Sequence, residues 1–175
     1  MTANSSAFLS NLLCTVARLL LCFWVGGAVL FVITSVAEQR YPTFDSRIRD
    51  QLATIRFPIY YQFCWLTMGV ALAATIAAFL TDTHPRRKQF AISATITAIS
   101  LMIAAADYTL IYLPLQKLIT PPGQTRSEQF TQLHNRSRYA NQTHLGIALI
   151  SAVVLCTPIR KDDKTTDSNA TTHQS

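Results

Sequence analysis

The segment "LLLCFWVGGAVLFVITSVA" (residues 19–37) decides the fold class, because it holds no charged residue and is rich in leucine, valine and phenylalanine. As a helix, roughly 20 apolar residues cross the hydrocarbon core of a bilayer, which is about 30 Å thick. Three further stretches have the same character, at residues 63–81, 90–106 and 145–157, and the charged residues gather between them. This partition indicates an integral membrane protein with four spanning helices.

The four spans are expected near residues 12–36, 59–81, 90–113 and 139–157. Together they form one membrane domain over residues 1–158, followed by a polar and disordered tail over residues 159–175. Pro58 is expected to open the second span and Pro114 to close the third, since proline suits a first helical turn and stops a last one. The runs lack the alternation of barrel strands, so we predict an all-α, four-helix transmembrane bundle.

Two segments leave alternatives open. Residues 35–37, "SVA", resemble a signal-peptide cleavage site, but the apolar run from Leu19 is longer than such a peptide needs, which favours a retained helix.

In the first loop, residues 41–56 place apolar side chains on one helical stripe, which is typical of a short helix lying in the headgroup plane. A simple charged loop explains the same segment equally well. The stripe consists of Phe44, Ile48, Leu52 and Ile55.

The distribution of basic residues bears on orientation and location. Four spans place both termini on one side of the membrane, and the turn after the second span carries Arg86, Arg87 and Lys88 next to the bilayer. By the positive-inside rule this dense cluster favours cytoplasmic termini, although the longer loops hold more basic residues in total. We expect a multi-pass protein of the plasma membrane or an inner membrane.

The stretch "LMIAAADYTLIYLP" (residues 101–114) places the carboxyl group of Asp107 in an apolar run. An unpaired charge costs several kcal/mol at mid-bilayer and less toward the interface, so Asp107 should face the bundle and find a partner. The second and fourth helices both begin at the depth of Asp107. We therefore predict an ion pair with Arg138 or Arg56, or a proton shared with His134.

The starts of the second and fourth spans bring further polar side chains to this layer. The candidate binding residues are Asp107, His134, Arg138, Asn141, Arg56 and Gln62; Tyr60, Tyr61, Gln142 and His144 lie at the same depth. Two interpretations remain open. Asp107 either belongs to a buried ion pair or hydrogen-bond network that fixes helix register, or the layer binds a small polar ligand, an ion or a lipid head group.

Other intramembrane residues are expected to serve packing. Arg18 lies about one turn inside the first span, from which its long side chain can extend to the headgroups. Gly26 and Gly27 predict a close helix contact, because glycine lets backbones approach. The same is expected of a small-residue series in the second span. That series is Gly69, Ala73 and Ala77.

No motif indicates catalytic or redox chemistry. The four cysteines show no CxxC spacing, so neither disulfides nor a metal site is expected, and His144 lacks an identifiable facing histidine for a haem. We therefore expect no catalytic residues, no cofactor and no enzymatic activity. The net charge of +6 comes from basic residues that flank the spans, which suits anionic headgroups better than nucleic acid. The expected partners are membrane lipids and either a second copy or another membrane protein.

The order of these features resembles the transmembrane protein 205-like family, also called the domain of unknown function 4149. The resemblance covers residues 19–155 and rests on four segments: "FWVGGAVLF", "RFPIYYQF", "ADYTLIYLPLQKL" and "FTQLHNRSRYANQTHLG". In the last, Phe130, His134, Ser137 and Asn141 form one helical stripe. Sequences of this family often carry an asparagine late in the third helix, where this chain has Asp107 or a neighbour of it. The resemblance implies a small four-helix membrane protein without assigned catalytic chemistry.

Two functions of different class are therefore expected. The first is a structural or accessory membrane protein that acts through helix packing with itself or a partner. The alternative is a small transporter or ligand-binding membrane protein that uses the polar layer around Asp107.

Overall fold

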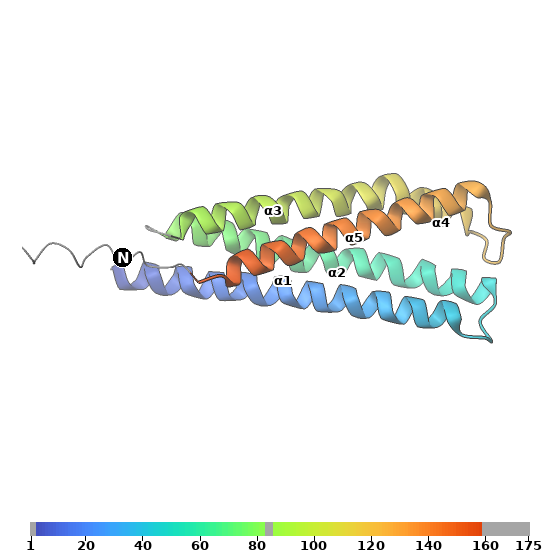
Figure 1. Ribbon diagram of the computed structural model, residues 1–175, viewed down its shortest axis with the longest axis horizontal. Helices are drawn as coiled ribbons and strands as arrows, with labels where there is room; N and C mark the ends of the chain where they lie inside the picture. The colour runs from blue at the N-terminus through green and yellow to red at the C-terminus, as the bar shows by residue number, and fades with distance from the viewer. Residues whose placement is uncertain (1–2, 83–85, 159–175) are drawn as a thin grey trace, which may run out of the picture.

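The computed structural model of the protein describes residues 3–82 and 86–158. The elements are α1 (Ala3–Arg40), α2 (Ser46–Thr81), α3 (Arg87–Ala106), the π-helix η1 (Asp107–Tyr112), α4 (Leu113–Leu118) and α5 (Glu128–Cys156). The long helices run antiparallel in a single bundle, in which the start of α1 and the end of α5 lie at the same end (Figure 1). The all-α four-helix prediction is confirmed.

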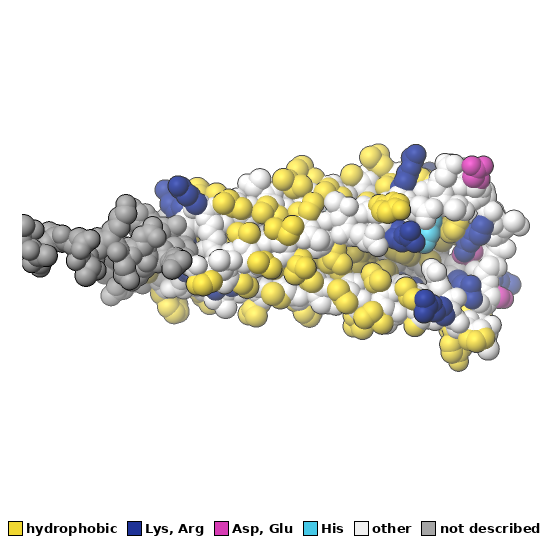
Figure 2. Space-filling model, viewed as in Figure 1, with side chains coloured by type: hydrophobic (Ala, Val, Ile, Leu, Met, Phe, Trp, Pro, Cys, Tyr) yellow, Lys and Arg dark blue, Asp and Glu magenta, His cyan; other side chains and the backbone are white. Residues whose placement is uncertain are grey.

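Four helical segments are long and apolar enough to cross a membrane. They are Ser5–Arg40, Ser46–Thr81, Arg87–Leu118 and Glu128–Cys156. Large hydrophobic side chains cover the outside of the bundle, and Phe8, Leu80 and Leu110 are each 71% exposed. Figure 2 shows this apolar surface along the middle of the bundle, with basic side chains toward both ends. Such a surface is stable where lipid tails replace water.

The bundle interior is built from one face of each long helix. Trp24 and Tyr61 are its largest buried side chains, and small residues let the helices approach around them. A Cβ at Gly27 would come within 2.7 Å of the Phe63 ring, so the predicted close contact at Gly27 is confirmed. In α2, the residues predicted to make a close helix contact are not the ones that face the core. Ala71, Ala74 and Ala78 face the core, whereas Ala73 is exposed and Gly69 is half-buried.

The first loop does not form a separate helix in the headgroup plane. Residues 46–58 are the beginning of α2. Asp45 is the N-cap of this helix, and its side chain accepts a hydrogen bond from the Ile48 amide at 2.8 Å. The helix continues through Pro58 into the second span. The third span likewise passes Pro114, which occupies the first turn of α4. Both helices therefore extend beyond the predicted spans.

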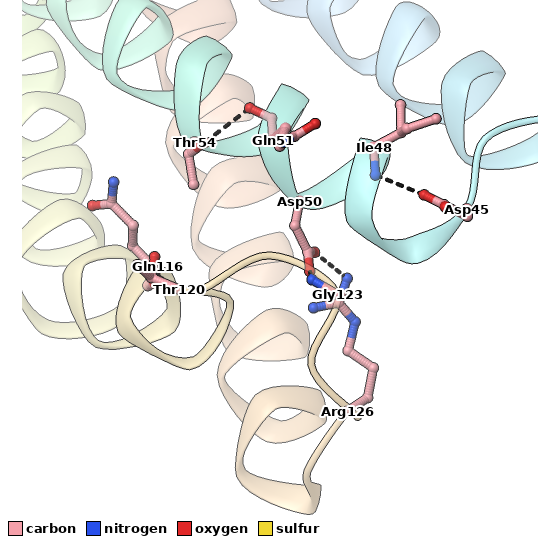
Figure 3. Close-up of polar contacts among 9 residues, drawn as sticks. All are labelled: Asp45, Ile48, Asp50, Gln51, Thr54, Gln116, Thr120, Gly123 and Arg126. Atoms are coloured by element: carbon pink, nitrogen blue, oxygen red, sulfur yellow. Dashed lines mark hydrogen bonds and ion pairs between the residues drawn. The ribbon is translucent and has the colours of Figure 1, made fainter.

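A buried carboxylate fastens the loop between α4 and α5 to α2. Asp50 is only 1% exposed and accepts hydrogen bonds from the Gly123 amide at 2.9 Å and from Arg126 Nη2 at 2.5 Å (Figure 3). Gly123 has a φ of +93°, which favours glycine at the turn. The Arg126 guanidinium also lies 4.1 Å from the centre of the Phe130 ring. These contacts hold the loop between α4 and α5 against the start of α2.

The tail predicted to be disordered, residues 159–175, lies outside the described residues.

Candidate functional site

Asp107 lies inside the bundle, at the end of α3, and is 1% exposed. Its Oδ2 atom accepts hydrogen bonds from the Tyr61 hydroxyl at 2.6 Å, from Asn141 Nδ2 at 3.0 Å and from the Ser137 hydroxyl at 3.3 Å. Tyr61 comes from α2, whereas Ser137 and Asn141 come from α5. One carboxylate oxygen thus joins three segments of the bundle.

The backbone changes its winding at this residue. Asp107 begins η1, a π-helical segment that extends to Tyr112. Asp107 continues the buried face of α3, which includes Ser100 and Ala104, and Tyr112 at the end of η1 is also buried. Short π-helical segments within α-helices occur frequently at functional sites. The departure from α-helical geometry coincides with Asp107, the single acidic residue of the third span.

The hydrogen bonds continue from Asn141 toward the middle of the bundle. The Tyr60 hydroxyl donates to Asn141 Oδ1 at 3.1 Å and lies 3.4 Å from His144 Nε2. His144 Nε2 is also 3.3 Å from Asn141 Oδ1. Six residues form this connected set, which we call the Asp107 network: Asp107, Tyr60, Tyr61, Ser137, Asn141 and His144.

Aromatic rings surround the network on two sides. The Tyr61 ring packs against Tyr108 and Tyr112, with ring centres 5.0 and 5.2 Å away. Trp24 stacks on His144 at 5.7 Å and packs against Tyr60 at 5.1 Å. These rings keep water and lipid away from the polar atoms, and hydrogen bonds gain strength where the local dielectric constant is low.

A second group of polar contacts lies deeper between α3 and α5. The Ser151 hydroxyl is 2.7 Å from the hydroxyls of both Ser93 and Thr97, and Ser100 donates to the His144 carbonyl at 2.8 Å. All four hydroxyl side chains are buried. Interhelical bonds of this kind hold helices together in a membrane, where hydrophobic burial alone provides little attraction between helices.

Several buried polar atoms in and beside the network have no hydrogen-bond partner among the described residues. These atoms are Asp107 Oδ1, Tyr112 OH, His144 Nδ1 and Trp24 Nε1. An unsatisfied buried polar atom costs about 1–3 kcal/mol, so each invites an explanation. They mark positions at which ordered water or a small polar molecule would gain hydrogen bonds.

The predicted ionic partners of Asp107 are wrong. Within residues 3–82 and 86–158, no Lys or Arg side chain forms an ion pair with Asp107. Arg56 instead pairs with Glu38 at 2.5 Å. Arg138 is exposed and lies over the Tyr139 ring, while His134 is stacked on Phe130.

Helical phase explains these differences. On α5, the inward side chains at residues 137, 141 and 144 follow a spacing of three to four, and residue 138 is turned about 100° away from this stripe. Gln62, next to Tyr61, is exposed for the same reason. Of the predicted binding residues, Asp107 and Asn141 come together, whereas His134, Arg138, Arg56 and Gln62 do not contact Asp107. Ser137, whose stripe carried the family resemblance, was not predicted as a partner of Asp107.

Arg18 lies near the end of the bundle at which α5 ends. Its Nε donates to the Leu155 carbonyl at 2.6 Å. That carbonyl lies in the last turn of α5, where the last four carbonyls lack intrahelical partners. Arg18 therefore joins α1 to the C-terminal end of α5.

The described part of the chain offers no cluster of three or more His, Cys, Asp or Glu side chains that could hold a metal ion. Cys14 and Cys64 are buried free thiols, and Cys22 and Cys156 are exposed free thiols. Comparisons of the chain with protein-family models, curated proteins and solved structures find no match. Function is therefore inferred from the geometry of the bundle.

Proposed function

We propose that the protein is a structural or accessory component of its membrane, which acts through packing of its helix bundle against a second copy or another membrane protein. One observation carries this proposal. Asp107 is sealed from the surface, and its Oδ2 atom accepts three hydrogen bonds from neutral side chains of α2 and α5. In the membrane such bonds fix the register of neighbouring helices.

The outer face of α2 offers a surface for such a partner. Gly69, Ala73 and Ala77 repeat every four residues, and a Cβ at Gly69 would meet no atom within 4 Å. Ala73 is exposed and Gly69 and Ala77 are half-buried, so this small-residue stripe is partly accessible from outside the bundle. Small residues at this spacing let two membrane helices approach closely. We place the partner on this stripe.

The experiment compares two substitutions of Asp107 in the detergent-purified protein. Asp107→Asn keeps an oxygen acceptor at this position, whereas Asp107→Leu removes the acceptor of three hydrogen bonds. A structural role predicts a large fall in thermal stability for Asp107→Leu and a small one for Asp107→Asn. Thr109→Val, a lipid-exposed substitution two residues away, serves as the control and should change little. Unchanged stability of Asp107→Leu would contradict the proposal.

The protein could instead be a small transporter or a ligand-binding membrane protein. Two observations favour this second function: the π-helix η1 begins at Asp107, and buried polar atoms around Asp107 lack hydrogen-bond partners among the described residues. The same variants test it. Ions, metals, small amines and lipids are screened for a rise in melting temperature of the wild-type protein. A ligand whose effect disappears in Asp107→Asn, although this variant remains folded, would replace the structural proposal with the binding one.

The proposal assigns no catalytic reaction to the chain. It places the termini in the cytoplasm and the bundle in the plasma or an inner membrane, and the basic cluster at Arg86, Arg87 and Lys88 supports that orientation. Membership of the transmembrane protein 205-like family stays a prediction.

A further inference from the structure

A crevice opens between α1 and α2 on the surface of the bundle. Its volume is about 200 Å³, and it is lined by Gly27, Phe31, Arg56, Ile59, Tyr60 and Phe63. Apart from Arg56 and the Tyr60 hydroxyl, this lining is apolar. We propose that this α1–α2 crevice binds one phospholipid with a primary-ammonium head group, whose phosphate contacts Arg56 and whose ammonium contacts Glu38. This binding site is additional to the proposed function; it shares Tyr60 with the Asp107 network, but the head group is recognised by Arg56 and Glu38, which lie outside that network.

The depth of the crevice fits a lipid that spans the boundary between head groups and tails. Arg56 lies about 38 Å along α2 from Thr81, at a rise of 1.5 Å per residue. The hydrocarbon core is about 30 Å thick, and the head groups extend the bilayer to about 40–45 Å. With Thr81 at one hydrocarbon boundary, Arg56 lies about 8 Å beyond the other boundary, at the outer edge of the opposite headgroup layer. Phe63, two turns further into the membrane, lies at the level of the lipid tails.

The headgroup end of the crevice presents a cation and an anion side by side. Arg56 Nη1 lies 2.5 Å from Glu38 Oε1, and the two side chains are 24% and 26% exposed. The guanidinium is 5.5 Å from the centre of the Phe31 ring, which holds it at the crevice. Arg56 Nε and Nη1 are buried and have no hydrogen-bond partner among the residues that the structure describes, although Nη1 is paired with Glu38. A guanidinium has five N–H donors, so the N–H groups of Nη2 remain for a phosphate at the exposed side of the guanidinium.

The pairing of opposite charges selects the head group. A zwitterionic lipid can match both charges, whereas an anionic lipid without an ammonium group leaves Glu38 unmatched. A primary ammonium donates hydrogen bonds to the second oxygen of Glu38, which a quaternary ammonium cannot do because it has no N–H. Phosphatidylethanolamine has this combination of phosphate and primary ammonium.

The apolar wall orients the lipid but does not select it. Ile59 is 59% exposed, and Phe31 and Phe63 are half-buried, so an acyl chain can lie along them. Neighbouring lipid tails are equally apolar, and packing against the wall therefore adds little free energy compared with the bulk bilayer. Selectivity must come from Arg56 and Glu38.

The test measures lipid retention and lipid-dependent thermal stability of the full-length protein in detergent, with phosphatidylethanolamine, phosphatidylcholine and phosphatidylglycerol added separately. We expect native mass spectra to show one retained phosphatidylethanolamine, and the melting temperature to rise more with this lipid than with the other two. Arg56→Gln and Glu38→Gln should each reduce the retained fraction about tenfold, the loss expected for one charge-assisted hydrogen bond. Arg138→Gln, which removes an exposed basic side chain on α5, should leave retention unchanged.

Three results would overturn the inference. Equal retention of phosphatidylcholine would show that the ammonium is not recognised, and preference for phosphatidylglycerol would assign the site to anionic lipids. Retention of phosphatidylethanolamine that survives Arg56→Gln would place the lipid elsewhere. If either variant fails to fold, the comparison of the three lipids on the wild-type protein still decides between these outcomes. None of them depends on whether Asp107 is structural.

Discussion

At the scale of single residues, Asp107 and its donors show how the bundle accommodates an acid without a cation. The carboxylate oxygen Oδ2 collects donors from Tyr61, Ser137 and Asn141, each of them uncharged. An unsatisfied buried polar atom is costly, so the three hydrogen bonds to Oδ2 offset part of the desolvation of the buried carboxyl group. The shortest of the three contacts, from Tyr61, should matter most.

We therefore expect Tyr61→Phe to destabilise the protein by about 1–3 kcal/mol, because it removes the 2.6 Å hydrogen bond and retains the ring. The measurement is the melting temperature in detergent. Tyr108→Phe is the matched control, since Tyr108 packs on Tyr61 but its ring contact does not require the hydroxyl. Equal effects of the two substitutions would show that the bond to Asp107 contributes nothing.

Two adjacent glycines provide a second residue-scale prediction. A Cβ at Gly27 would overlap the Phe63 ring at 2.7 Å, whereas a Cβ at Gly26 would meet nothing within 4 Å. Overpacking costs about 1–3 kcal/mol, and alanine also gains helix propensity over glycine at either position. Gly27→Ala should therefore be less stable than Gly26→Ala by about 1–3 kcal/mol in thermal unfolding. The opposite order would mean that Phe63 moves aside at no cost.

At the scale of elements, the contact of Asp50 with the loop over residues 119–127 holds α2 against the start of α5. Asp50 is buried, and its two partners, Gly123 and Arg126, both belong to this loop (Figure 3). Loops are generally the less stable parts of a fold, and this one depends on few buried apolar contacts. Its order should therefore depend on the carboxylate.

Asp50→Ala is expected to open this loop while the membrane-spanning part of the bundle remains folded. The substitution leaves the Gly123 amide and the Arg126 guanidinium without their acceptor. We expect faster proteolysis at Arg126 by trypsin, compared with the wild-type protein, in membranes that expose this end of the bundle. Glu128→Gln, which alters an exposed acid in the first turn of α5, is the control. Unchanged cleavage would show that other contacts hold the loop.

At the scale of the whole molecule, the bundle has an apolar exterior, unlike a soluble four-helix bundle, and an apolar interior that contains clusters of polar contacts. Polar contacts link α2, α3, η1 and α5 inside, while exposed leucine, isoleucine and phenylalanine side chains face outward (Figure 2). Such a molecule is fixed internally by hydrogen bonds and can associate laterally through close packing of small residues. The outward stripe at Gly69, Ala73 and Ala77 is the expected contact surface.

Association through this stripe is tested by oxidative cross-linking in native membranes. Ala73→Cys places a thiol on the exposed face of α2 and should yield a disulfide-linked dimer if a second copy packs there. Ala71→Cys, which faces the core, should not cross-link, and the wild-type protein gives the background from its exposed Cys22 and Cys156. Absence of a dimer with Ala73→Cys would exclude self-association on this face, and a larger cross-linked product would indicate another partner.

Much of this architecture follows from the sequence alone. The uncharged runs specify four spanning helices, because their length and composition match the thickness of the hydrocarbon core and helices satisfy their own backbone hydrogen bonds. The depth of Asp107 and its proximity to Asn141 were also predictable, since antiparallel helices of similar length bring the end of one beside the start of the next. Proline positions were less informative, because α2 continues through Pro58.

Only the tertiary structure decided which side chains meet. A shift of one residue rotates a helix face by about 100°, so residues at equal depth, such as Ser137 and Arg138, point to different surroundings. The rotation of each helix results from packing among all the helices; Asp107 continues the buried stripe of α3, and the π-helical winding that follows it brings Tyr112 to the interior. For that reason the sequence by itself determined the membrane bundle and its polar layer. The tertiary structure replaced the expected ion pair with hydrogen bonds from Tyr61, Ser137 and Asn141, and left Arg56 beside Glu38 at the lipid-facing crevice.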